Sequence, residues 1–129
     1  MYEKLLKLLS NSYSPYSKFR VSAIVVMKDG TEFSGVNVEN ASYGASICAE
    51  RSAIVSAISA GYKKDDFESL FVMCGDSNTI STCCFLCRQV ICEFFKENCK
   101  IECFDKVGNS KIFEVKELCP YPFDEGDLK

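Results

Sequence analysis

Two short stretches decide how this chain is organised: residues 47–51, with the sequence ICAER, and residues 83–88, with the sequence CCFLCR. Each stretch follows a loop of small polar residues and leads into apolar residues at helical spacing. The pattern predicts one helix over residues 48–60, ended by Gly61, and a second helix over residues 84–97. The first of these helices is expected to bury Ile54, Val55 and Ile58.

The two predicted helix starts carry three candidate metal ligands, which are Cys48, Cys84 and Cys87. Cys84 and Cys87 lie on one side of their helix, so both can reach one ion. Cys48 and Glu50 lie about 200° apart around their helix and can converge only beyond its end. The chain has no His, so a zinc ion would be held mainly by Cys. We therefore predict one Zn²⁺ per chain between the two helix N-termini, with an open fourth position beside Glu50, as in catalytic zinc sites.

Three thiolates around Zn²⁺ leave a net negative charge, which nearby positive groups can offset. Helix N-termini stabilise thiolates and supply part of this compensation. Arg51 and Arg88 each directly follow a motif residue and are candidates to donate from the guanidinium group to thiolate sulfur; we expect this role of Arg51 and not of Arg88. The alternative for each is an ordinary solvated arginine on the surface.

The rest of the chain consists of further predicted helices and strands. A helix is predicted over residues 2–12, strands over residues 21–27, 31–38, 70–74, 99–104 and 111–115, and a short helix over residues 115–118. The first two strands form a hairpin around a turn at Gly30. This order predicts an α/β fold, a three-layer α/β/α sandwich with a mixed sheet of about five strands. Residues 1–129 are expected to form a single zinc domain.

The charge of the chain and its pattern of apolar residues limit the kinds of molecule that the protein is expected to bind. The net charge is −3 and the basic residues are scattered, whereas nucleic-acid binding usually needs a basic patch. The longest uniform apolar run, residues 23–27, is far shorter than a membrane span. The chain has nine Cys, an odd number, and its start resembles an amphipathic helix more than a secretory signal. We therefore expect a reduced, cytoplasmic protein that binds a small molecule, and neither nucleic acid nor a membrane.

Further motifs along the chain resemble those of the cytidine deaminase family, in its small homotetrameric form with three Cys ligands. They are PYSKF at residues 15–19, GVNVENA at residues 35–41, ICAER at residues 47–51, CRQV at residues 87–90, and ELCP at residues 117–120 followed by Phe123. The resemblance covers nearly the whole chain. It implies zinc-dependent deamination of cytidine and 2′-deoxycytidine to uridine and 2′-deoxyuridine in pyrimidine salvage, with release of ammonia, by a homotetramer with shared active sites.

The resemblance also implies roles for individual residues. Cys48, Cys84 and Cys87 would hold the zinc ion, and Glu50 would carry protons between water and the base. The substrate would be bound by Phe19, which stacks on the pyrimidine, by Asn37 and Glu39 at the ribose 3′-hydroxyl, by the Ala49 N–H at O2, and by the Thr82 carbonyl at the leaving ammonia. Ala41, Tyr43 and Phe123 would reach into the pocket of a neighbouring subunit.

The second motif departs from the family, where Pro-Cys-Gly-x-Cys is the usual pattern. Cys83 stands at the Pro position and Phe85 at the Gly position. The partner of Cys87 is therefore either Cys83 or Cys84, and the two-residue spacing before CRQV favours Cys84. Other functions stay open. One is deamination of a modified cytosine nucleoside such as an aminoacylnucleoside antibiotic. The others are a non-catalytic structural zinc module with Cys83 or another thiol as fourth ligand, and a thiol oxidoreductase that uses Cys84 and Cys87.

Overall fold

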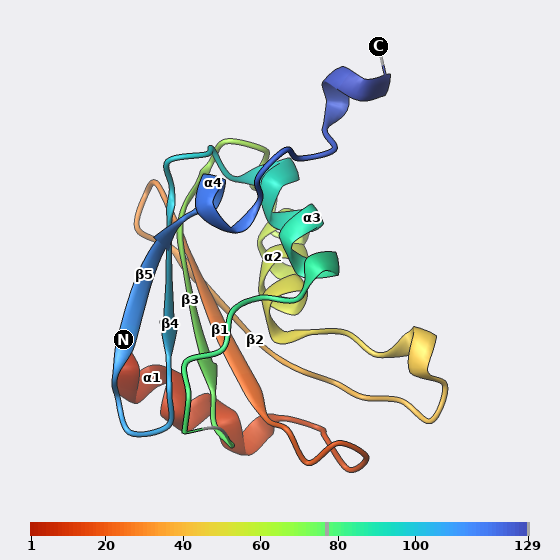
Figure 1. Ribbon diagram of the computed structural model, residues 1–129, viewed down its shortest axis with the longest axis vertical. Helices are drawn as coiled ribbons and strands as arrows, with labels where there is room; N and C mark the ends of the chain where they lie inside the picture. Colours follow the sequence, from red (N-terminus) through yellow and green to blue (C-terminus); the bar gives the residue numbers. More distant parts are fainter. Residues whose placement is uncertain (77, 129) are drawn as a thin grey trace.

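A five-stranded mixed sheet forms the centre of the molecule in the computed structural model, which describes residues 1–76 and 78–128 (Figure 1). Its strands are β1 (Val21–Met27), β2 (Glu32–Val36), β3 (Phe67–Cys74), β4 (Lys100–Phe104) and β5 (Ser110–Glu114). They lie side by side in the order β2-β1-β3-β4-β5. β3 and β4 run parallel, and the other neighbours run antiparallel. The mixed sheet expected from the sequence is confirmed.

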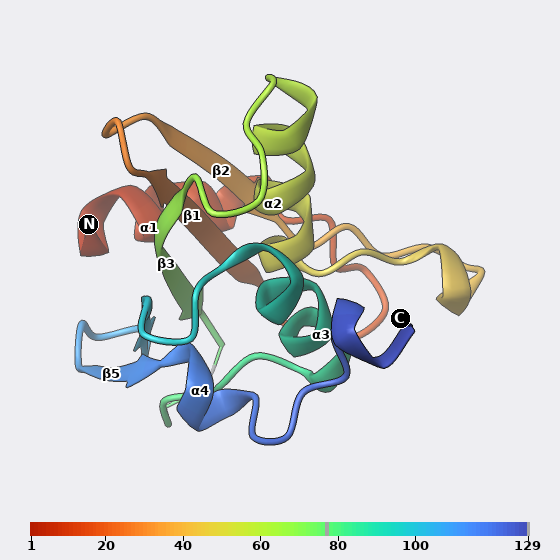
Figure 2. The same ribbon diagram turned by 90° about the horizontal axis from the view of Figure 1, so that it is seen from above.

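Helices cover both faces of this sheet (Figures 1 and 2). α1 (Tyr2–Leu8) packs on one face, and α2 (Ala49–Ser59) and α3 (Phe85–Phe94) pack on the other. The expected three-layer α/β/α sandwich is thereby confirmed. Shorter helical segments are η1 (Leu9–Asn11), η2 (Tyr43–Ala45), α4 (Val115–Leu118) and η3 (Glu125–Leu128). In the part of the chain that the structure describes, no helix has the length and apolar composition needed to cross a membrane.

Alternation of side chains along β1 explains the layers. Ala23 and Val25 are fully buried on the side of α2 and α3. Ile24, between them, is buried on the opposite side against Leu5 of α1. Successive side chains of a strand point to opposite faces, so β1, which is apolar from Ala23 to Met27, needs cover on both faces. The apolar composition of β1 therefore places it between the two helical layers.

Most predicted elements form, but several of their ends are shifted. The helix expected to reach residue 97 ends at Phe94, and the first helix continues beyond Leu8 only as a 3-10 turn. Ile54 is fully buried as expected, whereas the prediction that Val55 and Ile58 are buried is wrong, since they are 46% and 36% exposed. The buried stripe of α2 consists mainly of small residues, so the sheet covers only a narrow face of the helix. The stripe comprises Ala49, Glu50, Ala53, Ile54 and Ala57.

The contact between α2 and β2 is close because Gly35 lies directly beneath the helix. A β-carbon added at Gly35 would lie 2.5 Å from the backbone nitrogen of Ala53 and 2.6 Å from the carbonyl oxygen of Ala49. Only glycine leaves room for the helix backbone to approach the strand this closely. The contact sets the position of the N-terminus of α2, where Cys48 and Glu50 lie.

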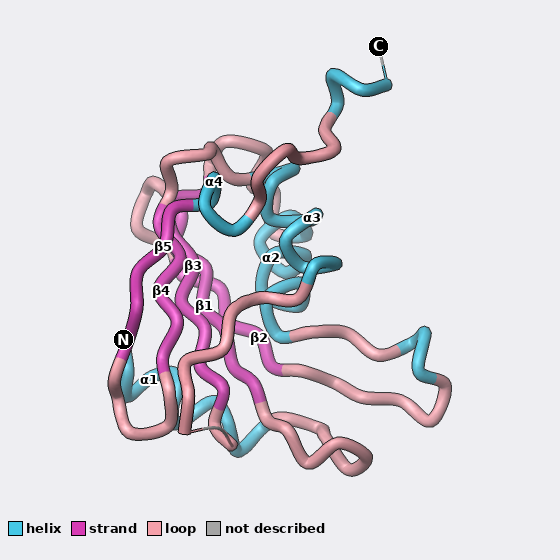
Figure 3. Tube along the Cα trace, viewed as in Figure 1, coloured by secondary structure: helices cyan, strands magenta, loops and turns pink. Residues whose placement is uncertain are grey.

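Two segments extend away from the layers (Figures 1 and 3). One is the connection between β2 and α2, residues 37–48, which contains η2. The other is the C-terminal segment after α4, residues 119–128, which ends in η3. Both carry exposed aromatic side chains, including Tyr43, Tyr121 and Phe123.

Candidate active site

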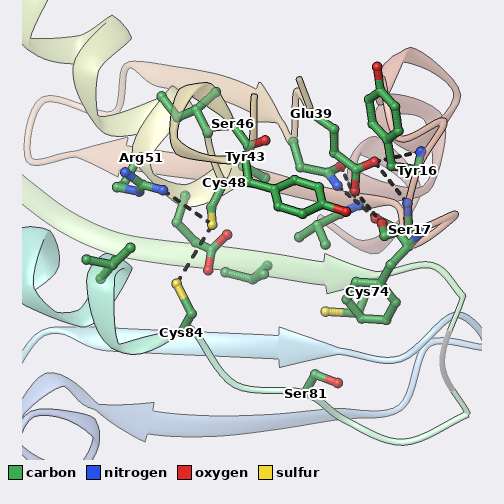
Figure 4. A pocket seen from close by; sticks show the side chains of 18 of the residues that line it. Tyr16, Ser17, Glu39, Tyr43, Ser46, Cys48, Arg51, Cys74, Ser81 and Cys84 are labelled. Carbon is green, nitrogen blue, oxygen red and sulfur yellow. Dashed lines mark hydrogen bonds between the residues drawn. The ribbon is translucent and has the colours of Figure 1, made fainter. Parts of the chain in front are cut away.

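A cavity of about 700 Å³ opens where the N-termini of α2 and α3 approach the end of β3 (Figure 4). Its other walls come from the loops around residues 16–19 and 37–47. A helix N-terminus presents unpaired N–H groups and the positive end of the helix dipole. The cavity is therefore suited to thiolates and carboxylates where the two helices begin.

Three thiols meet at this end of the cavity. Cys48 is the N-cap of α2, Cys84 is the N-cap of α3, and Cys87 lies in the first turn of α3. The sulfur of Cys84 is 3.7 Å from that of Cys48 and 3.3 Å from that of Cys87, and all three sulfurs lie within 4.8 Å of one another. Tetrahedral zinc, with Zn–S bonds of about 2.3 Å, separates its sulfur ligands by about 3.8 Å. The three thiols therefore fit a zinc ion after small side-chain adjustments.

Arg51 supplies positive charge beside this cluster. Its Nη2 atom lies 3.6 Å from the sulfur of Cys48, and among the described residues its buried Nε atom has no hydrogen-bond partner. A hydrogen bond from Cys87 lowers the pKa of Cys48 to about 5, and Arg51 contributes to this shift. Cys48 therefore favours the thiolate form that a metal ion requires.

Glu50 lies in the first turn of α2, lines the cavity and is 5% exposed. Burial raises the pKa of its carboxyl group, and the negative charge of Cys48 raises it further. A carboxyl group with a raised pKa in a cleft is a candidate for acid–base chemistry, because a raised pKa makes it a better proton acceptor that can still return the proton. Its place beside the thiols therefore suits the proton-carrying role expected of it.

Cys83 points into the core and not toward the other thiols. It is 2% exposed and packs among the core residues between the sheet and the helices. A hydrogen bond with Cys103 and burial raise the pKa of its thiol. In residues 1–76 and 78–128, the cluster that could hold a metal consists of Cys48, Cys84 and Cys87. The geometry therefore favours Cys84 over Cys83 as partner of Cys87, and it provides three ligands instead of the four of a closed zinc site.

The polar residues expected at the ribose line the same cavity, but their side chains also hold the loop that precedes β1. Glu39 accepts hydrogen bonds from the N–H groups of Tyr16 and Ser17 and from the Ser17 hydroxyl. Asn37 donates to the carbonyl of Phe19 at 2.7 Å and accepts from the first N–H of β1 at 2.9 Å. Phe19 itself lines the cavity and is 38% exposed. The two polar side chains thus help to place its ring.

The other residues expected at the substrate divide into two groups. Ala49, Thr82 and Tyr43 line the cavity. Ala41 and Phe123 are exposed and are not among the described residues that line it. They belong to the two segments that extend from the molecule. Their expected place in the pocket of a neighbouring subunit stays a prediction.

The family of this chain is shown by its similarity to known proteins. The family model for the zinc-binding region of cytidine and deoxycytidylate deaminases matches residues 1–103. The chain belongs to this deaminase family. Because the family binds zinc, zinc is the cofactor of this chain, and the three-thiol cluster is the group of described residues that could hold it.

Relatives of this deaminase match it over most of its length. It is similar to the cytidine deaminase of Mycoplasma genitalium, with 35% identity over 116 residues that cover 90% of this chain and 87% of the relative. It is also similar to the cytidine deaminase of Sporosarcina psychrophila, with 36% identity over 130 residues that cover 98% and 93% of the two chains. The crystal structure of cytidine deaminase from Burkholderia pseudomallei superposes with a TM-score of 0.86 at 35% identity, covering 95% of this chain and 99% of that chain.

In this deaminase, the Arg88 side chain contacts the loop before α3, the start of α3 and the end of α4. Its guanidinium group donates to the carbonyl of Cys83 at 2.7 Å, to the carbonyl of Leu118 at 3.0 Å and to the hydroxyl of Thr82 at 2.8 Å. It also stacks 4.4 Å from the ring centroid of Phe85. The structure therefore does not give Arg88 the candidate role of donor to thiolate sulfur. Its contacts instead tie the loop before α3 to α4.

Cys74 and Ser81 lie in the cavity wall, although the motifs found in the sequence include neither of them (Figure 4). Cys74 is the last residue of β3, and Ser81 lies in the loop three positions before Cys84. Neither belongs to a metal or nucleoside motif. The sequence indicates these two positions only by their small side chains with hydrogen-bonding groups. They stand at the two ends of residues 74–81, just before the second zinc motif.

Proposed function

We propose that the protein is a cytidine deaminase that hydrolyses cytidine and 2′-deoxycytidine to uridine and 2′-deoxyuridine and releases ammonia. The observation that carries this proposal is the buried carboxyl group of Glu50 beside a three-thiol cluster with no fourth Cys among the described residues. The names of its relatives support the same reaction. The cavity of about 700 Å³ falls in the usual range for small-molecule sites.

The zinc ion and the residues of the chain have different roles in the proposed reaction. A zinc ion held by Cys48, Cys84 and Cys87 would supply Lewis-acid activation of a water molecule. Glu50 accepts one proton of that water and passes it to N3 of the base, which makes C4 electrophilic for addition of the water oxygen. Glu50 then passes the second proton to the amino group, which leaves as ammonia. Both protons of water are thereby used, one in the product and one in ammonia.

The remaining residues orient the nucleoside. The Ala49 N–H at the start of α2 donates to O2 of the base, and the Phe19 ring stacks on it. A carboxylate has about four acceptor positions and an amide NH₂ has two donors. Glu39 uses three of these positions and Asn37 uses one of these donors within the chain. The ribose 3′-hydroxyl can therefore donate to Glu39 and accept from Asn37.

We further infer a homotetramer with shared active sites, formed by single-domain chains of residues 1–129 in the cytoplasm and acting in pyrimidine salvage. The extended segments around Ala41 and Tyr43 and around Phe123 support shared sites, because their apolar side chains are exposed in one chain. A neighbouring subunit would bury them and complete the wall of the cavity. The exposed apolar residues of α2, Val55 and Ile58, suit the same contact.

The proposal is tested by ammonia release and uridine formation from cytidine with zinc-loaded protein. Glu50→Gln should retain one zinc per chain and lower kcat by at least ~10²-fold, the usual scale for a general acid–base. Glu68→Gln, an exposed carboxylate of β3, is the matched control and should retain turnover. Near-full activity of Glu50→Gln would refute its role. A wild-type protein with bound zinc and no turnover of either nucleoside would refute the proposed substrate and direct attention to a modified cytosine nucleoside.

A further inference from the structure

The cavity has a small polar wall, formed by Cys74 and Ser81, that the proposed reaction does not use (Figure 4). Cys74 is 5% exposed and pairs across the sheet with Val21, which also lines the cavity. Ser81 is half-buried, and its hydroxyl lies close enough to the thiol of Cys74 to lower the pKa of that thiol, against the larger effect of burial. A thiol and a hydroxyl therefore lie together on the cavity surface.

The orientation of the base, which rests on the proposed function, decides what this wall meets. Around the pyrimidine ring, O2 faces the Ala49 N–H, N3 faces Glu50, and the amino group on C4 faces the carbonyl of Thr82. The next ring position is C5. Ser81 directly precedes Thr82 along the chain, and the thiol of Cys74 is close enough to Glu50 for its pKa to respond to that charge. The C5 edge of the base therefore faces the wall formed by Cys74 and Ser81.

The chemistry of this wall differs from what plain cytosine requires. The C5–H edge of cytosine is apolar, and an apolar wall would serve it equally well. Burial raises the pKa of Cys74 to about 12, so its thiol keeps its proton at neutral pH and can donate it. The Ser81 hydroxyl has lone pairs that can accept a hydrogen bond. A hydroxyl group attached at C5 of the base could therefore accept a hydrogen bond from the Cys74 thiol and donate one to the Ser81 hydroxyl.

We propose that the Cys74–Ser81 wall makes this deaminase select cytosine nucleosides with a small hydrogen-bonding group at C5, such as hydroxymethyl, over those with an apolar group of the same size. A hydroxymethyl group forms hydrogen bonds with the wall. An ethyl group fills the same volume but leaves the thiol and hydroxyl without water and without a new partner, which disfavours its binding.

The test compares three substrates by kcat/KM: 2′-deoxycytidine, 5-hydroxymethyl-2′-deoxycytidine and 5-ethyl-2′-deoxycytidine. The hydroxymethyl compound should exceed the ethyl compound at least about fivefold, the effect of one net hydrogen bond. Ser81→Ala and Cys74→Val should bring this ratio close to one. Cys92→Ala removes a thiol of α3 that is not among the residues lining the cavity, and should keep the wild-type ratio. Because each ratio is taken within one variant, changes in overall activity cancel.

The outcomes separate the two proposals. If 2′-deoxycytidine is deaminated but the ethyl compound reacts as well as the hydroxymethyl compound, the selection by this wall is refuted while the proposed function stands. If both cavity variants keep the wild-type ratio, the preference does not come from Cys74 and Ser81, and the inference is likewise refuted. If 2′-deoxycytidine is not deaminated at all, the proposed function fails and this inference fails with it. The comparison of the hydroxymethyl and ethyl substrates uses only the wild-type protein. It therefore stays decisive even if a variant does not fold.

Discussion

Replacing Gly35 with Ala should displace the helix that carries Glu50. The added methyl group would lie 2.5 Å from the backbone nitrogen of Ala53, 2.6 Å from the carbonyl oxygen of Ala49 and 2.9 Å from the β-carbon of Ser52. Ordinary contact begins at 3.4 Å, so the nearest atom must move away by 3.4 − 2.5 = 0.9 Å. Two of these atoms are backbone, which cannot turn aside as a flexible side chain can. The first turns of α2 must therefore shift relative to β2.

The expected magnitudes follow from that displacement. Overpacking of a well-packed core costs about 1–3 kcal/mol in the free energy of unfolding. An unfolding entropy of about 2.1 cal/mol/K per residue gives ~0.27 kcal/mol/K for 129 residues, so Tm should fall by about 4–11 °C. A shift of about 1 Å at a catalytic group can cost ~10²-fold in rate, and kcat for cytidine should therefore fall more than KM rises.

Calorimetry and steady-state kinetics on the zinc-loaded protein measure both effects. Gly44→Ala is the matched control for stability, since a β-carbon at Gly44 would meet no atom within 4 Å, and its Tm should stay within about 2 °C of wild type. A Gly35→Ala protein with wild-type Tm and wild-type kcat would refute the reasoning. It would mean that α2 can move away from β2 without cost and that its position does not set that of Glu50.

Two further predictions concern the ligands and the loop before β1. Cys84→Ala should lose the zinc ion, whereas Cys83→Ala should keep one zinc per chain because the Cys83 thiol is buried in the core; the opposite pattern in metal analysis would reverse the ligand assignment. Hydrogen bonds from Ser17 lower the pKa of Glu39. The Glu39 carboxylate therefore stabilises the folded protein at pH values above the ordinary pKa of about 4.3. This stabilisation is lost as the pH falls through the lowered pKa. Wild type should therefore resist urea better than Glu39→Gln at pH 6, by a margin that shrinks below about pH 4, and a margin independent of pH would contradict this.

Local patterns were enough to predict the layers and the ligand cluster. The two-residue spacing of Cys84 and Cys87 places both thiols at one helix start, and the structure brings their sulfurs to 3.3 Å. The order of predicted helices and strands favoured a sandwich with helices on both faces of the sheet, and the structure confirms it. Both inferences succeed because they depend on the fixed periods of a helix and a strand, which act over a few residues.

The sequence alone did not predict the contacts that join distant segments. Arg88 was a candidate donor to the thiols, with a solvated surface position as the alternative, but it donates to the carbonyl of Leu118, which is 30 positions away in the chain. Val55 was expected in the core, but the narrow contact made possible by Gly35 leaves it exposed. In each case the side chain had two sites compatible with its chemistry, and only the packing of other elements decided between them.

By itself, then, the sequence determined the elements, their layers and the grouping of three thiols with a carboxyl group, because short-range geometry and residue chemistry suffice for these. Only the tertiary structure decided that the Cys83 thiol lies in the core, that Asn37 and Glu39 hold the loop of Phe19, and that Cys74 and Ser81 share a wall of the cavity. The end of β3 and the loop before α3 meet at that wall because the sheet and α3 pack around one core. No periodicity in the sequence encodes such a meeting, since it depends on how all the layers fit together.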